Sequence, residues 1–286
     1  MKILNGAALA KKIKSVLAIE IDYLVKKYNR APKLSIILAG DDPTSISYVK
    51  NKQKSCNEIG ILCDLNLLPY STSQKEFLTI IEILNNDIQV DGILVQLPLP
   101  KHIDQNIILQ AIDYKKDVDG LHPMNVGLLN RADEGIIPCT PKGILSLLKA
   151  ENVPITGKHC VIIGRSNLVG KPMAQLMLRE NASVTVCHTK TRDLAYLTRQ
   201  GEILIIAIGH PNLVNADMLK EGAVVVDVGI NNVDGKLAGD LYNSIDVTDI
   251  EKKATAITPV PGGVGPMTIA SLLENVVEIY KRSHCN

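Results

Sequence analysis

The chain has 286 residues, of which 46% are hydrophobic and 21% charged, and its formal net charge is +1. This is enough chain for two domains with cores of their own. A near-neutral protein has no overall field that would attract nucleic acid or an acidic membrane, so we expect neither partner. No apolar run approaches a membrane span, and Lys11, Lys12 and Lys14 interrupt the N-terminal segment that would form a signal-peptide core.

The six cysteines form no Cys-x-x-Cys pair and no ligand cluster with the histidines. Several of them lie in apolar strand patterns, which favours free, reduced and mostly buried thiols. We therefore expect a cytoplasmic enzyme or binding protein without a metal site.

The first half of the chain alternates between helical and strand patterns. Helices are predicted at residues 13–24, 45–59, 73–84 and 103–112, and strands at 34–38, 61–68 and 92–97. Ser73 and Glu76 have capping-box spacing at the start of the third helix. Pro98 and Pro100 end the third strand, because proline cannot donate to a central ladder. The alternation indicates a parallel sheet with helices on both faces.

Residues 113–140 break this alternation and are predicted to be a loop connecting two domains. Thr140 and Pro141 are typical of a helix N-cap and first position. Strands are then predicted at 160–163, 183–187, 203–207, 223–228 and 255–257, a turn at Asp234-Gly235, and helices from 170, at 191–198 and at 268–280. The fold class is therefore α/β, with two domains of mostly parallel sheet, the C-terminal one of Rossmann type.

The stretch from Cys160 to Met177 joins an apolar strand to an amphipathic helix through Gly164 and Gly170. Glycines at such a turn tolerate positive φ and let a phosphate approach the backbone. The unpaired N–H groups of the helix start offer an anion site. The spacing is Gly-x-Ser-x-x-x-Gly, whereas the common dinucleotide fingerprint is Gly-x-Gly-x-x-Gly. The stretch indicates a dinucleotide turn, but any parallel β-α unit also needs a tight turn.

The predicted strand 183–187 is followed by hydroxyl and basic residues, Thr189, Lys190 and Arg192 among them. Many NAD enzymes place Asp or Glu near this point to hold the ribose 2′-hydroxyl. Hydroxyl and basic groups suit a 2′-phosphate instead, and Arg165 offers a planar cation. We therefore predict NADP rather than NAD, with a basic surface turn as the alternative.

Tyr48 and Lys52 are four residues apart and share a face of their predicted helix, whereas Lys50 points elsewhere. A partly desolvated lysine beneath an aromatic ring can act as a base. The alternative is a solvated helix face. Gln96 stands at the carboxyl end of a strand, where ligands of open α/β sheets gather. A buried amide there needs a ligand or a local partner.

Two loops are further candidates. Asp119 lies in the predicted connection, where a carboxylate can accept two hydrogen bonds from an amidine-like edge, unless this is an ordinary turn with surface ion pairs. Residues 258–268 contain three glycines and three prolines, with Gly262 and Gly263 adjacent. Such a loop is stiff yet lets a ligand approach its backbone. We favour a functional role for it.

Five stretches, in order along nearly the whole chain, resemble motifs of the bifunctional methylenetetrahydrofolate dehydrogenase/cyclohydrolase family. They are residues 48–52, 91–100, 116–120, 164–172 and 259–268. Two positions depart mildly from the family pattern: Thr189 stands where serine is common, and Leu168 where isoleucine is common. Because 286 residues are too few for the formate-ligase domain that some relatives append, we do not expect that activity.

The resemblance implies NADP-dependent oxidation of 5,10-methylenetetrahydrofolate to the 5,10-methenyl cation, then hydrolysis to 10-formyltetrahydrofolate. This is chemistry of one-carbon metabolism and purine biosynthesis. The resemblance also implies a folate-binding catalytic domain at 1–139, joined by the C-terminal helix 268–286. An NADP-binding domain at 140–267, a cleft between the domains and a homodimer complete the implied organisation.

The same resemblance assigns residue roles. Lys52 is the catalytic lysine, Gln96 assists it, Tyr48 stacks on the folate and Asp119 holds the pterin ring. The residues that line the substrate and cofactor sites are Gly262, Gly263, Gly164, Arg165, Ser166, Thr189, Thr268 and, at the nicotinamide, Ile230. Two alternatives stay open: a dehydrogenase with little cyclohydrolase activity, and a non-catalytic NADP-binding module.

Overall fold

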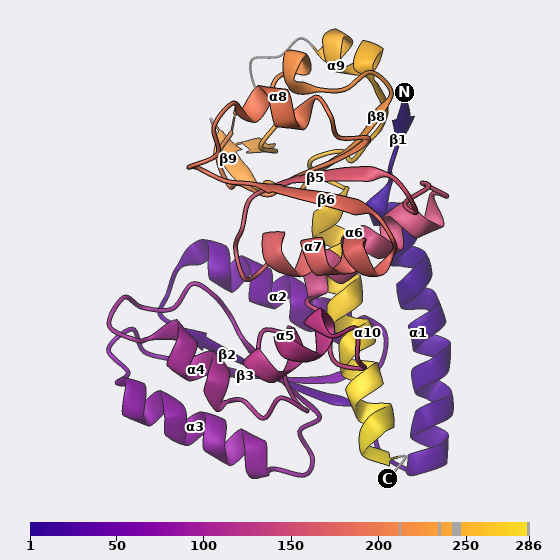
Figure 1. Cartoon of the computed structure of the whole chain (residues 1–286). Coiled ribbons are helices and arrows are strands. Elements are labelled where there is room, and N and C mark those ends of the chain that lie inside the picture. Colours follow the sequence, from indigo (N-terminus) through magenta and orange to yellow (C-terminus); the bar gives the residue numbers. More distant parts are fainter. Residues whose placement is uncertain (212, 234–235, 242–246, 285–286) are drawn as a thin grey trace. The chain divides into compact units, whose positions relative to one another are not determined.

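The computed structural model describes residues 1–211, 213–233, 236–241 and 247–284. The chain forms two compact units. The three-stranded unit contains residues 12–139 and 269–286, and the six-stranded unit contains residues 1–11 and 140–268. Both divisions that involve the chain ends fall inside helices, α1 (Gly6–Tyr28) and α10 (Val264–His284), which are labelled in Figure 1.

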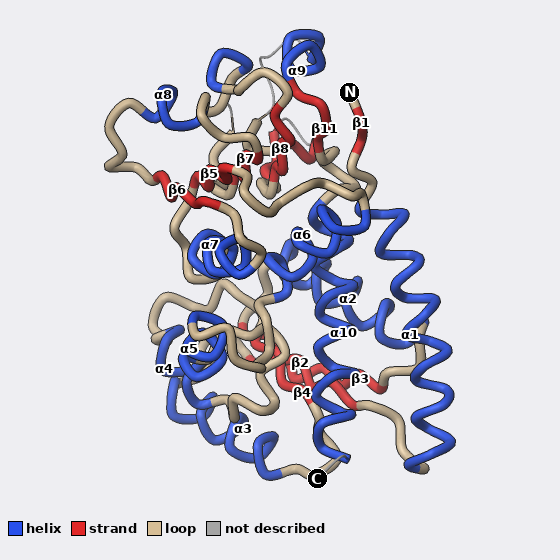
Figure 2. The backbone as a smooth tube through the Cα atoms, turned by 45° about the vertical axis from the view of Figure 1, so that its right-hand side comes forward, coloured by secondary structure: helices blue, strands red, loops and turns tan. Residues whose placement is uncertain are grey.

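The sheet of the three-stranded unit has the order β3-β2-β4, and both strand pairs are parallel. Figure 2 shows these strands side by side. The strands are β2 (Lys33–Ala39), β3 (Leu62–Leu68) and β4 (Gly92–Val95). The helices are α2 (Pro43–Glu58), α3 (Gln74–Asn86), α4 (Gln105–Ala111) and α5 (Pro123–Asn130).

Alternate residues of β2 divide the core of this unit in two. Leu34, Ile36 and Leu38 are buried in a cluster with residues of α1, α2 and α10. Ile37 and Ala39 are buried with residues of α3 and α4. Since successive side chains of a strand point to opposite faces, the sheet is covered by helices on both sides. The expected α/β layering is confirmed here.

The helix starts of this unit follow local sequence signals. At α3 the Ser73 hydroxyl accepts a hydrogen bond from Glu76 N at 3.3 Å and the Glu76 carboxylate accepts one from Ser73 N at 2.8 Å, which confirms the capping box. Helix α5 lies where a loop was predicted, so that prediction is wrong. Its start has a signal of its own: His122 Nδ1 accepts from Met124 N at 3.0 Å, and Pro123 takes the first helical position.

The sheet of the six-stranded unit has the order β1-β11-β8-β7-β5-β6, and all its pairs are parallel. The strands are β1 (Lys2–Ile3), β5 (His159–Ile163), β6 (Ser183–Cys187), β7 (Ile203–Ile206), β8 (Ala223–Asp227) and β11 (Ala254–Ile257). The helical elements are α6 (Cys139–Ala150), α7 (Gly170–Arg179), α8 (Leu194–Thr198), α9 (Val247–Lys253) and the short 3₁₀ helix η1 (Ala216–Met218).

The core of this unit also depends on strand alternation. Val161 and Ile163 of β5 are buried in one cluster with Leu204 and Ile206 of β7, beneath side chains of α8, η1 and α9. Helix α7 packs against β5 and β6. The parallel α/β class with a Rossmann-type C-terminal unit is thereby confirmed.

Several boundaries differ from the predictions. Residues 1–11 were expected in the N-terminal domain, but β1 pairs with β11, and these residues belong to the six-stranded unit. An antiparallel hairpin of β9 (Asn231–Val233) and β10 (Lys236–Ala238) was not predicted. The turn predicted at Asp234-Gly235 lies outside the described residues.

Two helix starts also differ. Helix α6 already includes Cys139, so Thr140 is not its N-cap. The Thr140 hydroxyl instead lies 3.0 Å from Thr268 Oγ1. Helix α10 begins at Val264 rather than at Thr268. A proline in a first helical turn is tolerated, which is why Pro141 and Pro266 do not delay these starts.

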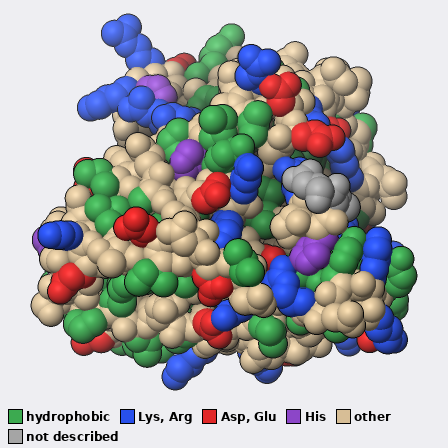
Figure 3. Space-filling model, turned by 90° about the horizontal axis from the view of Figure 1, so that it is seen from below, with side chains coloured by type: hydrophobic (Ala, Val, Ile, Leu, Met, Phe, Trp, Pro, Cys, Tyr) green, Lys and Arg blue, Asp and Glu red, His purple; other side chains and the backbone are tan. Residues whose placement is uncertain are grey.

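Basic and acidic side chains are interspersed over most of the face shown in Figure 3, in keeping with a net charge of +1. Within the described part of the chain, no helix has the combination of length and apolar character needed to cross a membrane.

Candidate active site

The amine of Lys52 is held by the amide of Gln96 in the three-stranded unit. Lys52 Nζ donates to Gln96 Oε1 at 2.9 Å, joining α2 to the end of β4. Lys52 is half-buried, and Gln96 is only 9% exposed. Tyr48, one helical turn before Lys52, is 37% exposed and presents its ring on the same side of α2.

The orientation of Gln96 is fixed from two directions. Its backbone N–H donates to Ile37 O at 2.9 Å, continuing the β2–β4 ladder. Its side-chain Nε2 donates to Leu97 O at 2.7 Å, which leaves Oε1 facing Lys52. A neutral acceptor therefore fixes the amine without adding a charge next to it.

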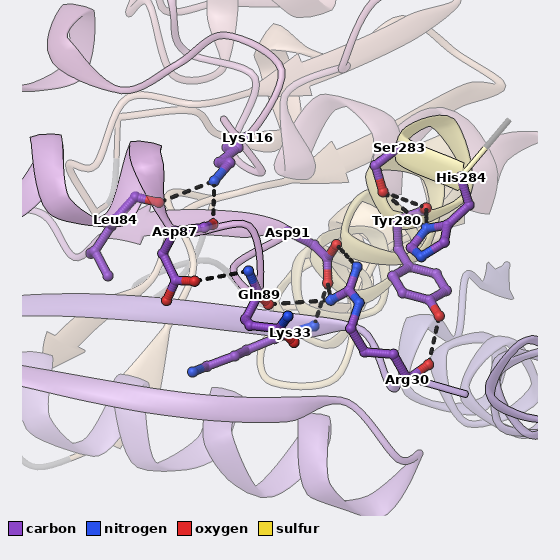
Figure 4. Close-up of polar contacts among 10 residues, drawn as sticks. All are labelled: Arg30, Lys33, Leu84, Asp87, Gln89, Asp91, Lys116, Tyr280, Ser283 and His284. Carbon is purple, nitrogen blue, oxygen red and sulfur yellow. Dashed lines mark hydrogen bonds and ion pairs between the residues drawn. The ribbon is translucent and has the colours of Figure 1, made fainter. Parts of the chain in front are cut away.

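The opposite end of β4 is anchored by an ion pair (Figure 4). The guanidinium of Arg30 donates to both carboxylate oxygens of Asp91, at 2.8 and 2.7 Å, and Lys33 N donates to the same carboxylate at 2.8 Å. Arg30 lies 4.8 Å from the centre of the Tyr280 ring, and the Tyr280 hydroxyl donates to Arg30 O. The hydrogen bond to Asp91 raises the pKa of Arg30. This anchor sets the position of the strand that carries Gln96.

The segment Lys116–Gly120 contains two residues with structural hydrogen bonds, Lys116 and Asp117, and one partly exposed acid, Asp119. Lys116 Nζ donates to Leu84 O at 3.1 Å and to Asp87 O at 2.8 Å, closing the end of α3 (Figure 4). Burial lowers the pKa of Lys116. Asp117 is buried and accepts from His122 N at 2.8 Å and from Asn125 Nδ2 at 2.9 Å. Burial raises the pKa of Asp117.

Asp119 is the remaining acid of this segment, and it is partly exposed. No hydrogen-bond donor to its carboxylate occurs among the described residues. Helix α10 supports the loop that carries Asp119, because Asn275 Nδ2 donates to Val118 O at 2.8 Å and to Ile137 O at 2.9 Å. The result is a rigidly supported carboxylate that is available to a ligand.

The turn between β5 and α7 in the six-stranded unit requires glycine at two places. Gly164 has φ +125°, and a Cβ there would lie 2.2 Å from Ala207 O. A Cβ at Gly170 would lie 2.1 Å from Gly164 O. The Ser166 hydroxyl accepts from Val169 N at 3.1 Å and so shapes the turn itself. The bare backbone and the helix start fit the phosphates of a dinucleotide.

Arg165 and Thr189 follow two neighbouring strands. Gly164 N donates to Cys187 O at 2.9 Å, so the carboxyl ends of β5 and β6 are adjacent. Both side chains are exposed. Ile230 follows β8 at the same sheet edge and is 46% exposed. A Cβ at Gly265 would lie 3.7 Å from its Cδ1, so Ile230 packs next to the glycine-rich loop.

The glycine-rich loop lies against the start of α1. Ala7 N donates to Gly262 O at 2.8 Å, and Gly262 has φ +110°. A Cβ at Gly6 would lie 1.9 Å from Gly263 O, so the two backbones are in close contact. Thr268 lies inside α10, where its hydroxyl donates to Val264 O at 3.3 Å. Thr268 is thus not at the helix start, where it was expected.

Four polar residues that support the Lys52–Gln96 pair and the Asp119 loop in the three-stranded unit were not predicted from the sequence: Arg30, Asp91, Asn125 and Asn275. In the six-stranded unit, the buried acids Asp227 and Asp240 were not predicted either. Only Asp91 offered a signal, as a charge directly before an apolar strand. Over the described residues, His, Cys, Asp and Glu side chains form no group of three that could hold a metal ion.

A Rossmann-type unit with an open glycine turn, combined with an α/β unit that carries a Lys–Gln pair, defines a nucleotide-dependent α/β enzyme. The NAD(P)-binding-domain model of the tetrahydrofolate dehydrogenase/cyclohydrolase family matches residues 138–284, and the catalytic-domain model matches residues 4–119. The chain belongs to the tetrahydrofolate dehydrogenase/cyclohydrolase family.

Individual relatives cover the chain almost completely. The bifunctional protein FolD of Sulfurihydrogenibium sp. is 52% identical over 284 residues, covering 99% of this chain and 98% of the relative. The crystal structure of the bifunctional FolD enzyme of Campylobacter jejuni is 50% identical, with a TM-score of 0.95 and 99% of each chain covered. The Trypanosoma brucei enzyme, solved with NADP cofactor and inhibitor, is 38% identical with a TM-score of 0.92, covering 99% of this chain and 98% of that one.

Proposed function

We propose that this chain oxidises 5,10-methylenetetrahydrofolate with NADP and hydrolyses the resulting 5,10-methenyl cation to 10-formyltetrahydrofolate. The observation that carries the proposal is the hydrogen bond of 2.9 Å from Lys52 Nζ to Gln96 Oε1, made by two residues that the family resemblance assigns to catalysis. The three-stranded unit, matched by the catalytic-domain model, binds the folate. The six-stranded unit, most of which the NAD(P)-binding model covers, binds the cofactor.

Hydrolysis needs a proton acceptor near the bridging carbon of the methenyl cation, because an attacking water must lose a proton. We assign this role to the Lys52 amine. Gln96 orients the amine without a charge that would hold it as an ion pair. Tyr48 provides an aromatic face for the folate, and Asp119 accepts hydrogen bonds from the amidine-like edge of the pterin.

NADP, when bound, supplies the hydride acceptor for the oxidation. The chain contributes mainly positioning to this step. Gly164 and Gly170 leave the backbone bare for the pyrophosphate, and Ser166 holds the turn. We assign Arg165 and Thr189, both exposed, to recognition of the 2′-phosphate. We assign the exposed Ile230 to an apolar contact with the nicotinamide. We also assign Gly262, Gly263 and Thr268 to the lining of the ligand sites.

The same proposal includes a homodimer in the cytoplasm. Strand β3 is an edge strand that pairs with β2 alone among the described residues. It exposes Leu62 by 54% and Leu67 by 64%. An exposed apolar edge strand is a ready surface for a second copy. The described cysteines are free thiols, which suits a reducing compartment.

A spectroscopic assay with purified protein, methylenetetrahydrofolate and each nicotinamide cofactor tests the proposal. We expect reduced NADP to form, with only transient accumulation of the methenyl species. Reduced cofactor with a methenyl species that does not decay would leave only the dehydrogenase. Folded protein without turnover would support the cofactor-binding module instead.

A further inference from the structure

Two buried carboxylates lie at the carboxyl edge of the six-stranded sheet, outside the groups assigned above. Asp227 ends β8 and is 3% exposed, and Asp240 follows β10 and is 0% exposed. Within the described residues, neither forms an ion pair. Buried acids need other partners, because an unsatisfied carboxylate in a protein interior is very costly.

Asp240 binds the segments that follow β7 and β8. Its Oδ2 accepts from Ile208 N at 2.7 Å and from Gly209 N at 2.9 Å. Its Oδ1 accepts from Asn231 Nδ2 at 3.0 Å. One carboxylate therefore holds both segments at a single point.

Asp227 closes the same arrangement from the other side. Its Oδ1 accepts from Gly229 N at 3.0 Å and from Asp240 N at 2.9 Å, and its Oδ2 accepts from Leu241 N at 2.9 Å. The Asp227 backbone N–H donates to Thr258 Oγ1 at 2.8 Å, which brings in the end of β11. Three backbone N–H groups therefore converge on the Asp227 carboxylate and hold these segments together.

Two glycines make room for the two acids in a reciprocal way. A Cβ at Gly229 would lie 2.2 Å from Asp240 Oδ1, and a Cβ at Gly239 would lie 1.9 Å from Asp227 Oδ2. Each carboxylate thus occupies the space that a side chain on the facing strand exit would need. The fit indicates that Asp227, Asp240, Gly229 and Gly239 form one packed cluster, which we call the double-aspartate clamp.

The clamp holds both chain neighbours of Ile230, because Gly229 N donates to Asp227 and Asn231 Nδ2 donates to Asp240. Ile230 itself is 46% exposed. We infer that Asp227 and Asp240 are positioning residues for the dehydrogenase reaction, because they fix the backbone of residues 207–209 and 228–231 against which the nicotinamide half of the cofactor is placed. This inference rests on the proposed function. Hydride transfer depends steeply on the placement of the reacting carbon, so a displaced segment should impair it.

The test uses the full-length protein with Asp240→Asn. In this variant an NH₂ group replaces one carboxylate oxygen and has to face either the Ile208 and Gly209 N–H groups or the Asn231 amide. We expect the specificity constant for NADP in the dehydrogenase reaction to fall about tenfold or more, through both KM and kcat. Cyclohydrolase activity, measured on methenyltetrahydrofolate without cofactor, should stay within about twofold of the wild-type value. The matched control is Asp217→Asn, in the same unit but with a side chain 92% exposed, which should change neither activity.

A second variant keeps both acids and fills the space between Gly229 and the Asp240 carboxylate. Gly229→Ala forces a methyl group onto Asp240 and should reproduce the selective loss of the dehydrogenase. Activities are compared at a temperature where near-ultraviolet circular dichroism shows each variant folded. A lower melting temperature with unchanged KM and kcat for NADP, or an equal fall in both activities, would overturn the inference. Absence of dehydrogenase activity in the wild-type protein would instead contradict the proposed function.

Discussion

At the scale of single residues, hydrogen-bond partners distinguish structural groups from the proposed reactive groups of the same type. Lys116 and Lys52 are both partly buried lysines, but Lys116 donates to two backbone carbonyls that end a helix, whereas Lys52 donates to a side-chain amide. Asp117 and Asp119 differ in the same way, since only Asp117 is held by neighbouring donors among the residues that the structure describes.

Lys52→Met should abolish most of the cyclohydrolase activity, because a thioether cannot accept a proton. A loss of about 100-fold or more is expected for a general base. The measurement is the decay of methenyltetrahydrofolate. Lys50→Met is the matched control, because Lys50 lies on the same helix but is exposed on another face. Unchanged hydrolysis in the Lys52 variant would refute the catalytic role.

Asp117→Asn should alter the pH dependence of stability. Burial raises the pKa of Asp117, so the folded protein holds this proton to higher pH than the unfolded chain does. The contribution of Asp117 to stability is therefore lost as pH rises from about 4, near the unfolded pKa, through the folded pKa. Asparagine keeps an acceptor for His122 N and does not ionise. Urea unfolding at several pH values should show the variant gaining stability relative to wild type as pH rises; a constant difference would contradict the assignment.

At the scale of elements, strand ends carry the proposed catalytic groups, and strand starts carry the groups that anchor the strand. Strand β4 has Gln96 just beyond one end and Asp91 just before the other. The β5–α7 turn has a similar arrangement, because Gly164 directly follows the buried strand β5 and begins the proposed cofactor-binding turn.

Gly164→Ala should selectively impair the dehydrogenase. The added methyl group would meet Ala207 O at 2.2 Å in a backbone conformation that side chains rarely adopt. We expect KM for NADP to rise about tenfold or more with cyclohydrolase activity retained. Gly157→Ala is the control that distinguishes backbone strain from a steric contact. Gly157 also has positive φ, +75°, but nothing lies within 4 Å of its Cβ position. That control should cost about 1 kcal/mol of stability and leave KM for NADP unchanged.

Asp91→Ala should strongly destabilise the three-stranded unit. Removing one member of a buried ion pair leaves the Arg30 guanidinium without its carboxylate partner, at a cost of about 3–5 kcal/mol. The side chain of Asp91 is 2% exposed. Asp64→Ala breaks an ion pair with Lys33 in which the Asp64 side chain is 57% exposed, and should cost less than about 1 kcal/mol. Chemical denaturation of both variants measures the contrast, and equal losses would contradict the assigned role of the anchor.

At the scale of the whole molecule, the chain divides into units of non-contiguous sequence. Residues 1–11 complete the six-stranded unit, and residues 269–286 complete the three-stranded one. Helix α10 supplies core residues such as Leu273, Val276 and Tyr280 to the latter unit. Truncating either end of the chain would therefore remove part of a core.

Leu67→Arg should convert the proposed dimer to a monomer, because a charge would be buried at the edge of β3. Sedimentation velocity of wild type and variant measures the change. Ile88→Arg is the control, since Ile88 is 85% exposed in the same unit but lies outside β3. A monomeric wild type, or an unaltered dimer in the Leu67 variant, would contradict the assigned interface.

Much of this protein follows from short-range patterns. The apolar runs of β2, β5, β7 and β8 predicted buried parallel strands, and the Ser73 capping box predicted the start of α3. These signals are readable because strand alternation, helix periodicity and capping depend on residues only a few positions apart. Motif order also pointed to the family, since Lys52, Gln96, Asp119 and Gly164 each stand in a characteristic run.

Other features depend on residues that are distant in sequence. The pairing of β1 with β11, the anchor between Arg30 and Asp91, the Asn275 support of the Asp119 loop and the double-aspartate clamp each join segments that no local pattern connects. The sequence by itself determined the strand and helix pattern, the family and the candidate reactive groups, because these follow from the order of side chains along the chain. Only the tertiary structure decided which acids and amines are held by buried partners, because a buried hydrogen bond exists only where folding brings its donor and acceptor together.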